Sequence, residues 1–315
     1  MKRQMKDQSD QPTSLRHLAG QKSAVALARM HLDATHIDNR RFPNALMIGP
    51  SGVGKTMLAA VIGCELAVPT RLSFGQALNC RSVLHQTLLR MERDEILFID
   101  EAHEMKSTIQ TALFNVIDRR AVVLGDCGGH GVMQIPVKPF TLILATTDPQ
   151  RLLTPLRNRC EVTFVLDLYA EDELAEIVQR RIQWRGWTCE DGLPEEIAQR
   201  SRGVAREAIR ILTGCHRVAR SQGEQSVCQQ HLLDLCQLEG IDGRGLNRMD
   251  CRYLGLLKHN GQRLNVLASQ LCLPPRQVSD VIEPYLMRIG FLVKNERAVR
   301  LLTAAGREHV ETEQI

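Results

Sequence analysis

Aromatic residues are scarce in this 315-residue chain: they make up 4% of it, with two Trp and three Tyr. Proteins that grip single-stranded nucleic acid hold successive bases against several aromatic faces, so the scarcity argues against that class. Net charge is also small, because 40 Lys and Arg stand against 36 Asp and Glu, which leaves +4. A bias this weak does not by itself indicate a nucleic-acid-binding protein, and the distribution of charge along the chain matters more.

Paired cysteines and long apolar runs are missing too. The ten Cys are scattered and form no C-x-x-C, which argues against a structural zinc site or a disulfide framework. The longest mostly apolar run, residues 58–68, is about half a membrane span and contains Glu65. The N-terminal MKRQMKDQSDQ has no apolar segment and does not resemble a secretory signal. We therefore expect a cytoplasmic protein with reduced thiols and no membrane partner.

The composition is otherwise that of a folded protein, with 43% apolar and 24% charged residues. At roughly 100 to 200 residues per domain, the length corresponds to two or three domains. Residues 1–13 are polar and aperiodic, and we expect them to form a disordered tail. Residues 14–170 alternate short apolar runs with amphipathic stretches, which is typical of a parallel sheet with crossover helices. The expected strands are ALMIG (45–49), EILFID (95–100), FTLILATT (140–147) and EVTFVLDL (161–168).

The rest of the chain has a different pattern. Residues 171–240 lack strand-like runs and are predicted to form a small domain of consecutive helices. Residues 241–315 give three short helical stretches and then two strand-like runs around a polar turn, an order that indicates a winged helix. The expected fold class is therefore α/β: a large parallel-sheet domain followed by a helical domain and a C-terminal winged helix.

The motif with the clearest chemistry is GPSGVGKT at residues 49–56, which fits G-x-x-x-x-G-K-[ST] directly after an expected strand. Its glycines let the backbone turn so that N–H groups and the next helix N-terminus cradle a phosphate. We expect Lys55 to reach the β- and γ-phosphates of a nucleotide and the Thr56 hydroxyl to ligate Mg²⁺. A chance match in a glycine-containing loop is the alternative, and the strand before and helix after disfavour it.

Two further expected strands end in polar residues. The first ends in Asp100 and Glu101: Asp100 is predicted to hold Mg²⁺ through water, and Glu101 to orient the water that attacks the γ-phosphate. Such a strand end is common, but together with the phosphate loop it predicts a hydrolase. For His103, on the same turn, a solvated or capping role and a coupling role both stay open. The other strand ends in Thr146, which would lie at the same edge if the strands are neighbours.

Two basic clusters, PLRNRC (155–160) and SRGVAR (201–206), complete the motifs. Arginine suits phosphate recognition because its planar fork matches phosphate oxygens, although solvated basic turns are the plainer interpretation. In this order the motifs resemble those of the AAA+ ATPases and, more closely, of the RuvB family of Holliday-junction branch-migration motors, over residues 15–309. The matching segments are LRHLAGQ (15–21), LFIDEAH (97–103), PFTLILATT (139–147), TPLRNRC (154–160), RSRGVAREAIR (200–210) and EPYLMRIGFL (283–292).

The resemblance implies an AAA+ P-loop NTPase domain, a helical lid and a hexameric ring with ATP at subunit interfaces. Arg159 would be the arginine finger that reaches a neighbour's γ-phosphate, Arg206 the sensor of the lid and Thr146 the sensor of the sheet. The residues implied to contact ATP are Leu15, Arg16, Gly49, Gly52, Val53, Gly54, Lys55, Thr56, Met57, Tyr169 and Arg206. Two departures, Cys160 for the family's Phe and Val204-Ala205 for its Thr-Pro, remove no charge, so we expect the ATP chemistry to persist.

The resemblance also implies two interaction surfaces. Residues 125–136 replace an apolar hairpin that docks on RuvA, so a RuvA-like junction-binding partner is implied there; a collapsed surface loop is equally open, because the segment is rich in glycine. Residues 244–300 hold ten Lys or Arg and four Asp or Glu, a local +6 suited to phosphate contacts without sequence preference. The expected DNA-binding residues are Arg276, Lys294, Arg297 and Arg300. A protein-docking winged helix with a solvated basic face is the alternative.

We therefore predict a ring-forming ATPase, with ATP and Mg²⁺ as cofactors, that moves duplex DNA and promotes branch migration of Holliday junctions in recombination and repair. Two alternatives remain. The N-R-C triplet that ends in Cys160, and the wing turn at residues 295–300, which lacks the family's glycine, suggest a clamp-loader-like or other AAA+ assembly or remodelling ATPase acting on protein partners. A DNA-binding switch whose ATP site controls assembly only is the other.

Overall fold

The structure is a computed structural model that describes residues 12–124 and 133–312. It divides into two compact units, Met1–Arg185 with Gly203–Arg206, and Gly186–Arg202 with Glu207–Ile315. No helix among the described residues is both long and apolar enough to cross a membrane.

The first unit is built on a five-stranded parallel sheet with strand order β2-β3-β6-β1-β7. The strands are β1 (Ala45–Ile48), β2 (Thr70–Phe74), β3 (Ile96–Asp100), β6 (Thr141–Thr146) and β7 (Val162–Val165). All residues of β6 are buried, as expected for the middle of a sheet covered on both faces. The four expected strands are present, whereas the edge strand β2, half-exposed and with only two large apolar residues, was not predicted.

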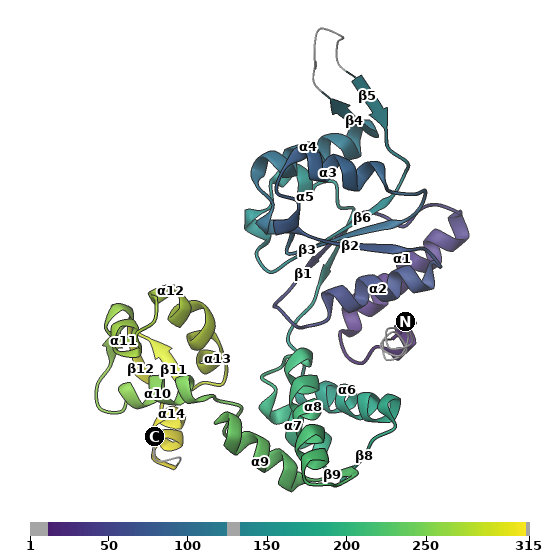
Figure 1. Cartoon of the computed structure of the whole chain (residues 1–315). Helices are drawn as coiled ribbons and strands as arrows, with labels where there is room; N and C mark the ends of the chain where they lie inside the picture. Colours follow the sequence, from purple (N-terminus) through teal and green to yellow (C-terminus); the bar gives the residue numbers. More distant parts are fainter. Residues whose placement is uncertain (1–11, 125–132, 313–315) are drawn as a thin grey trace. The chain divides into compact units, whose positions relative to one another are not determined.

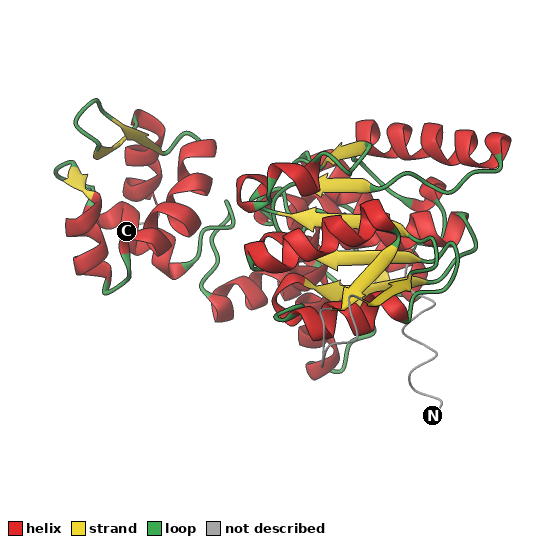
Figure 2. Cartoon of the chain, turned by 90° about the horizontal axis from the view of Figure 1, so that it is seen from above, coloured by secondary structure: helices red, strands yellow, loops and turns green. Residues whose placement is uncertain are grey.

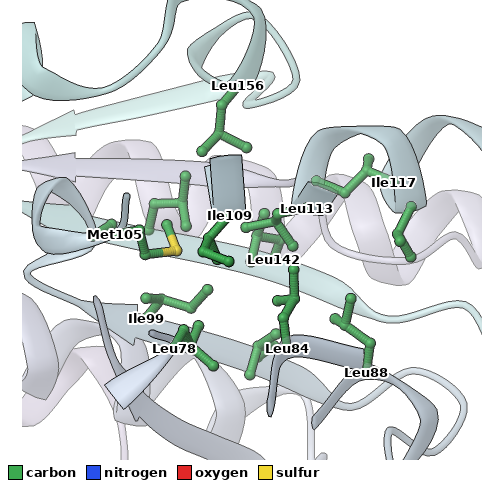
Figure 3. Packing of buried hydrophobic residues seen from close by; sticks show 14 of the residues in the cluster. Leu78, Leu84, Leu88, Ile99, Met105, Ile109, Leu113, Ile117, Leu142 and Leu156 are labelled. Atoms are coloured by element: carbon green, nitrogen blue, oxygen red, sulfur yellow. The ribbon is translucent and has the colours of Figure 1, made fainter. Parts of the chain in front are cut away.

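Helices cover both faces of this sheet (Figures 1 and 2). On one face lie α1 (Lys22–Asp38) and α2 (Lys55–Glu65); on the other lie α3 (Arg81–Leu89), α4 (Ser107–Arg119) and α5 (Thr154–Arg157). Because side chains alternate along a strand, β3 sends Ile96 and Phe98 into the first core and Leu97 and Ile99 into the second. Figure 3 shows the second core, where leucines of α3 and α4 meet β3 and β6.

A hairpin extends away from the sheet at the top of Figure 1. Its strands, β4 (Ala121–Leu124) and β5 (Met133–Pro136), are antiparallel, with Leu124 opposite Met133. Met133 is 62% exposed and Leu124 is 36% exposed. Most of the predicted partner-docking segment, residues 125–132, lies outside the described residues, as do residues 1–11 of the predicted tail. The first unit also contains α6 (Glu171–Arg185).

The helical part that follows contains α7 (Leu193–Arg200), α8 (Ala205–Ser221) and α9 (Gln229–Glu239). The expectation of no strands here was wrong in one detail, because β8 (Thr188–Cys189) pairs with β9 (Ser226–Val227) in a short parallel ladder. Two-residue strands leave no periodicity that a sequence pattern could reveal.

The C-terminal part has the helices and the hairpin expected of a winged helix. Its helices are α10 (Arg248–Leu256), α11 (Leu264–Leu271), α12 (Pro275–Gln277), a π-helical turn (Val278–Ile282), α13 (Glu283–Arg288) and α14 (Ala304–Thr312). β11 (Leu292–Lys294) and β12 (Val299–Leu302) form the wing, and β10 (Gln262–Arg263) adds to β12. Tyr253, Leu267 and Leu286 are among the residues of its own buried core.

Candidate nucleotide site and DNA-binding surface

The loop between β1 and α2 has the backbone that the glycine motif requires. Gly52 and Gly54 have φ angles of 81° and 103°, which L side chains rarely adopt. A Cβ at Gly49 would come within 2.2 Å of the Leu166 carbonyl oxygen. α2 begins at Lys55, so the loop leads directly into a helix N-terminus, a natural site for phosphate.

Lys55 is 5% exposed and lies over this loop. Its Nζ donates to the carbonyl oxygens of Gly49 (2.7 Å) and Pro50 (2.9 Å). Burial lowers the pKa of Lys55, the carboxylates of Glu101 and Asp100 oppose that shift, and Arg206 adds to it. The ammonium group is therefore held next to the loop, within the electrostatic influence of both acidic residues.

The end of β3 supplies oxygen atoms suited to a divalent cation. The Thr56 hydroxyl donates to Asp100 Oδ2 over 3.2 Å, which brings one hydroxyl and one carboxylate oxygen together beside the loop. Mg²⁺ prefers oxygen ligands of this kind together with phosphates and water, so the residues fit the predicted MgATP. Glu101 follows with φ 45° and ψ 51°, a left-handed conformation that is costly for a residue with a Cβ and often found at functional sites.

The Glu101 carboxylate is tied to the end of the neighbouring strand, β6. Its Oε2 accepts hydrogen bonds from Thr147 Oγ1 (3.1 Å) and Thr147 N (3.4 Å) and lies 3.2 Å from His103 Nδ1. The same Nδ1 lies 3.0 Å from Thr146 Oγ1. The predicted water-positioning residue and sheet sensor are thus linked by His103, whose side chain is 11% exposed. A solvated His103 is therefore wrong, and the contact to Thr147 was not foreseen.

The segment at Gly203–Arg206 closes on the same loop. Arg206 N donates to Gly52 O and its guanidinium donates to the Ser51 hydroxyl, both over 3.3 Å. Tyr169 donates from its hydroxyl to Val53 O (2.8 Å) and from its backbone N to Gly203 O (2.9 Å). The predicted lid sensor and one predicted nucleotide neighbour therefore lie at the phosphate loop.

The remaining predicted nucleotide neighbours differ in exposure. Leu15 is 4% exposed and packs in the core beside α2, where its backbone N donates to Glu65 Oε1 over 2.9 Å. Arg16 is exposed, and Met57 is partly buried in the first turn of α2. Any nucleotide contact of Leu15 would involve its backbone, because its side chain is enclosed.

Two family models match the chain. Residues 11–166 match the Holliday junction DNA helicase RuvB P-loop domain, and residues 243–311 match the RuvB C-terminal winged helix domain. A curated relative, the Holliday junction branch migration complex subunit RuvB of Thermotoga maritima, is 30% identical over 96% of this chain and 92% of its own. The chain belongs to the RuvB family. The fold and the order of its domains are those of that family.

Other relatives agree. The RuvB subunit of Fervidobacterium nodosum is 30% identical over 91% of this chain and 84% of its own. The solved structure of the Thermotoga maritima RuvB Holliday junction branch migration motor superposes with a TM-score of 0.82 and 30% identity, covering 96% of this chain and 98% of that one. The Aeropyrum pernix ORC2 protein, at 15% identity and a TM-score of 0.53, shares the fold alone.

Arg159, the finger predicted from the RuvB resemblance, has a defined partner within its own unit. Its Nε and Nη2 donate to the two carboxylate oxygens of Asp118 over 3.0 and 2.6 Å, and its Nη1 donates to Pro155 O. The guanidinium carbon lies 5.1 Å from the centre of the Phe114 ring. The hydrogen bond from Arg159 lowers the pKa of Asp118. Asp118 was not predicted, because nothing in the sequence connects it with a residue 41 positions later.

The winged helix separates its basic residues into two kinds. Arg300 is 6% exposed, and its guanidinium donates to Glu283 Oε1 (2.8 Å) and Oε2 (3.2 Å). We therefore correct the prediction that Arg300 contacts DNA, because a buried guanidinium paired with a fully buried carboxylate belongs to the core. Lys294 also pairs with Glu283 (2.7 Å) but keeps 34% of its side chain exposed. Arg276 and Arg297 are exposed.

Proposed function

We propose that this chain is an ATP-driven motor that promotes branch migration of Holliday junctions in recombination and repair, as the names of its RuvB relatives suggest. The observation that carries the proposal is the convergence of Lys55, Asp100, Glu101 and Arg206 on one phosphate loop. A protein that only binds a nucleotide would need the phosphate loop and no acidic residues beside it. The acidic strand end placed beside it supports turnover of the nucleotide.

Each residue has a distinct task. Lys55 and the loop N–H groups bind the β- and γ-phosphates, while Thr56 and Asp100 hold Mg²⁺, which neutralises charge on the phosphate oxygens when bound. Glu101 orients the attacking water. Thr146 and Arg206 sense the γ-phosphate from the sheet and from the start of α8. The loop conformation and the buried Lys55 support this arrangement.

We infer that Arg159 acts on the nucleotide of a neighbouring subunit, which requires a homo-oligomeric ring, with six subunits as the resemblance implies. The side chain is 31% exposed and its guanidinium is already oriented by Asp118. Rings mixed from Arg159→Ala and Lys55→Ala subunits should regain part of the turnover that each variant lacks alone. Complete absence of rescue would count against action between subunits.

Two surfaces would join this ring to its substrate. Arg276, Lys294 and Arg297 supply exposed charge for the phosphates of duplex DNA. The exposed Leu124 and Met133, the last described pair of the hairpin, support an apolar docking site at residues 125–136 for a RuvA-like junction-binding protein.

The deciding experiment measures ATP turnover of the full chain with a four-way junction, with linear duplex DNA and without DNA, at low salt. A motor requires stimulation by DNA, and a fluorescent junction assay should show strand exchange only with hydrolysable ATP. Turnover without DNA stimulation would overturn the motor and favour the assembly ATPase that the N-R-C triplet ending in Cys160 suggests. DNA binding controlled by ATP but without strand exchange would favour the switch.

A further inference from the structure

His103 occupies a position between two residues of the ATP site. It lies in the short 3-10 turn Ala102–Glu104 that follows β3. Its Nδ1 is 3.0 Å from Thr146 Oγ1 and 3.2 Å from Glu101 Oε2, so a single ring nitrogen faces both groups. The contacts join the ends of β3 and β6, which are neighbours in the sheet.

The two neighbours decide which nitrogen carries the ring proton. An ionised carboxylate oxygen can only accept a hydrogen bond, whereas a hydroxyl can accept or donate. An Nδ1 without a proton would turn its lone pair towards Glu101 Oε2, and the two would repel. Hydrogen positions are assigned from such partners, and here they assign an N–H to Nδ1, which donates to Thr146 Oγ1 and lies close to Glu101 Oε2.

This assignment fixes the direction of the Thr146 hydroxyl. Thr146 Oγ1 also lies 3.0 Å from the backbone N of Asp148. A backbone N–H can only donate, so Thr146 Oγ1 accepts this hydrogen bond. A hydroxyl has two acceptor positions and one proton. With Asp148 N–H and His103 Nδ1–H filling the acceptor positions, the Thr146 proton is left to donate to another group. Thr146 is fully buried in this structure, so a γ-phosphate can reach the hydroxyl only once the groups that cover it move. The oxygens of a γ-phosphate are acceptors, so this is the orientation that a phosphate sensor needs.

The Glu101 carboxylate is oriented by the same contacts. Within the described part of the chain, its hydrogen bonds from Thr147 and its 3.2 Å contact with His103 Nδ1 all involve Oε2. Oε1 is thereby left to accept a hydrogen bond from water. The left-handed backbone of Glu101 further restricts where this carboxylate can lie.

We propose that His103 is a positioning residue, whose Nδ1–H makes Thr146 a donor to the γ-phosphate and holds Glu101 Oε2 so that Oε1 can orient the attacking water. The inference rests on the proposed function, since it assumes ATP hydrolysis at this site. In this arrangement, His103 Nδ1 connects Thr146, which contacts the γ-phosphate, with Glu101, which orients the attacking water.

The test compares two variants of the full chain that differ in one donor. In His103→Asn the amide Nδ2, attached to Cγ like Nδ1, can still donate; His103→Leu keeps the branched shape without a donor. Removing a donor that touches the reacting oxygen costs about 10²-fold or more in kcat, so a positioning donor should cost about 10-fold. We expect that loss in His103→Leu and a kcat within about 3-fold of the original chain in His103→Asn, with ATP affinity changed by less than about 3-fold in both.

A double variant and a control complete the test. If His103 acts through Thr146, the combined loss in His103→Leu with Thr146→Val should be smaller than the product of the two single losses. His36→Leu, on the exposed face of α1, makes the same substitution elsewhere and should leave kcat unchanged.

The outcomes separate the two hypotheses. An unmodified chain that does not hydrolyse ATP, with or without junction DNA, would overturn the proposed function and this inference with it. An active unmodified chain with His103→Leu equally active, or with His103→Asn as impaired as His103→Leu, would overturn the role of Nδ1–H alone. A fall in ATP affinity that accounts for the whole loss would also overturn it, because a positioning role predicts a loss in kcat.

Discussion

The nucleotide site and the winged helix use charged residues in opposite ways. At the nucleotide site, Lys55, Asp100 and Glu101 are at the ends of regular elements and lie around one loop. In the winged helix, the buried Glu283 pairs with Arg300, which is itself buried, and with Lys294, which keeps 34% of its side chain exposed. Only part of the basic charge there is therefore available to a ligand. A motif therefore locates chemistry more dependably than a local excess of charge does.

The first and largest test of this contrast removes the carboxylate of Glu101. Glu101→Gln keeps the shape of the side chain but removes the negative charge that polarises water, so kcat should fall by about 10² to 10⁴-fold while ATP binding persists. Single-turnover assays and fluorescent-nucleotide binding would measure the two effects separately. Turnover close to that of the unmodified chain would show that another group positions the water.

The second test addresses the buried cluster of the winged helix. Burial opposes ionisation of Glu283, but hydrogen bonds from Arg300 and Lys294 outweigh it and lower the pKa of Glu283. Glu283→Gln should reduce the free energy of unfolding of the winged helix by about 3 kcal/mol, because it leaves a buried Arg300 without its counter-charge. Urea unfolding followed by circular dichroism would measure the loss, and Glu296→Gln at the exposed wing is the matched control.

The same pKa shift predicts a pH dependence. A carboxyl group whose pKa is lower in the folded state stabilises fully above its unfolded pKa, about 4.3 for Glu, and this contribution is lost as pH falls through the folded pKa. The free energy of unfolding of the unmodified winged helix should therefore fall in acid below about pH 4. In Glu283→Gln this part of the pH dependence should be absent. An equal acid response in both would mean that Glu283 does not carry it.

The sequence could predict most of the nucleotide site because its signals are local. GPSGVGKT and the acidic strand end specify their own backbone, and adjacent parallel strands bring Thr146 to the same edge. The roles of His103 and Asp118 depend on contacts over distances of 43 and 41 positions, which no local pattern encodes. The prediction that Arg300 contacts DNA failed for a related reason. Alternation along β12 places Arg300 on its buried face, but the carboxylate that pairs with it there, Glu283, is on a helix and could not be identified from the strand pattern.

The third test compares two arginines three positions apart. Arg297→Ala should weaken binding to duplex DNA a few-fold. It should also reduce the slope of the logarithm of the binding constant against the logarithm of salt concentration by about 1, as loss of one phosphate contact does. Its free energy of unfolding should not change. Arg300→Met should lower stability and leave the affinity of the folded protein unchanged. Fluorescence anisotropy at several salt concentrations, with thermal unfolding alongside, would distinguish them. A reversed pattern would restore Arg300 as a DNA contact.

The fourth and smallest effect concerns Asp118 as the support of Arg159. The pair is partly exposed, with 31% of the Arg159 side chain and 43% of the Asp118 side chain accessible, so its energetic contribution is screened by solvent. Asp118→Asn should therefore lower kcat only a few-fold, since the contacts of the guanidinium with Pro155 O and the Phe114 ring remain. Asp118→Glu should recover part of that loss by restoring a carboxylate. A loss as large as that of Arg159→Ala would instead mean that Asp118 alone determines where the Arg159 guanidinium lies, and that the contacts of the guanidinium with Pro155 O and the Phe114 ring contribute little.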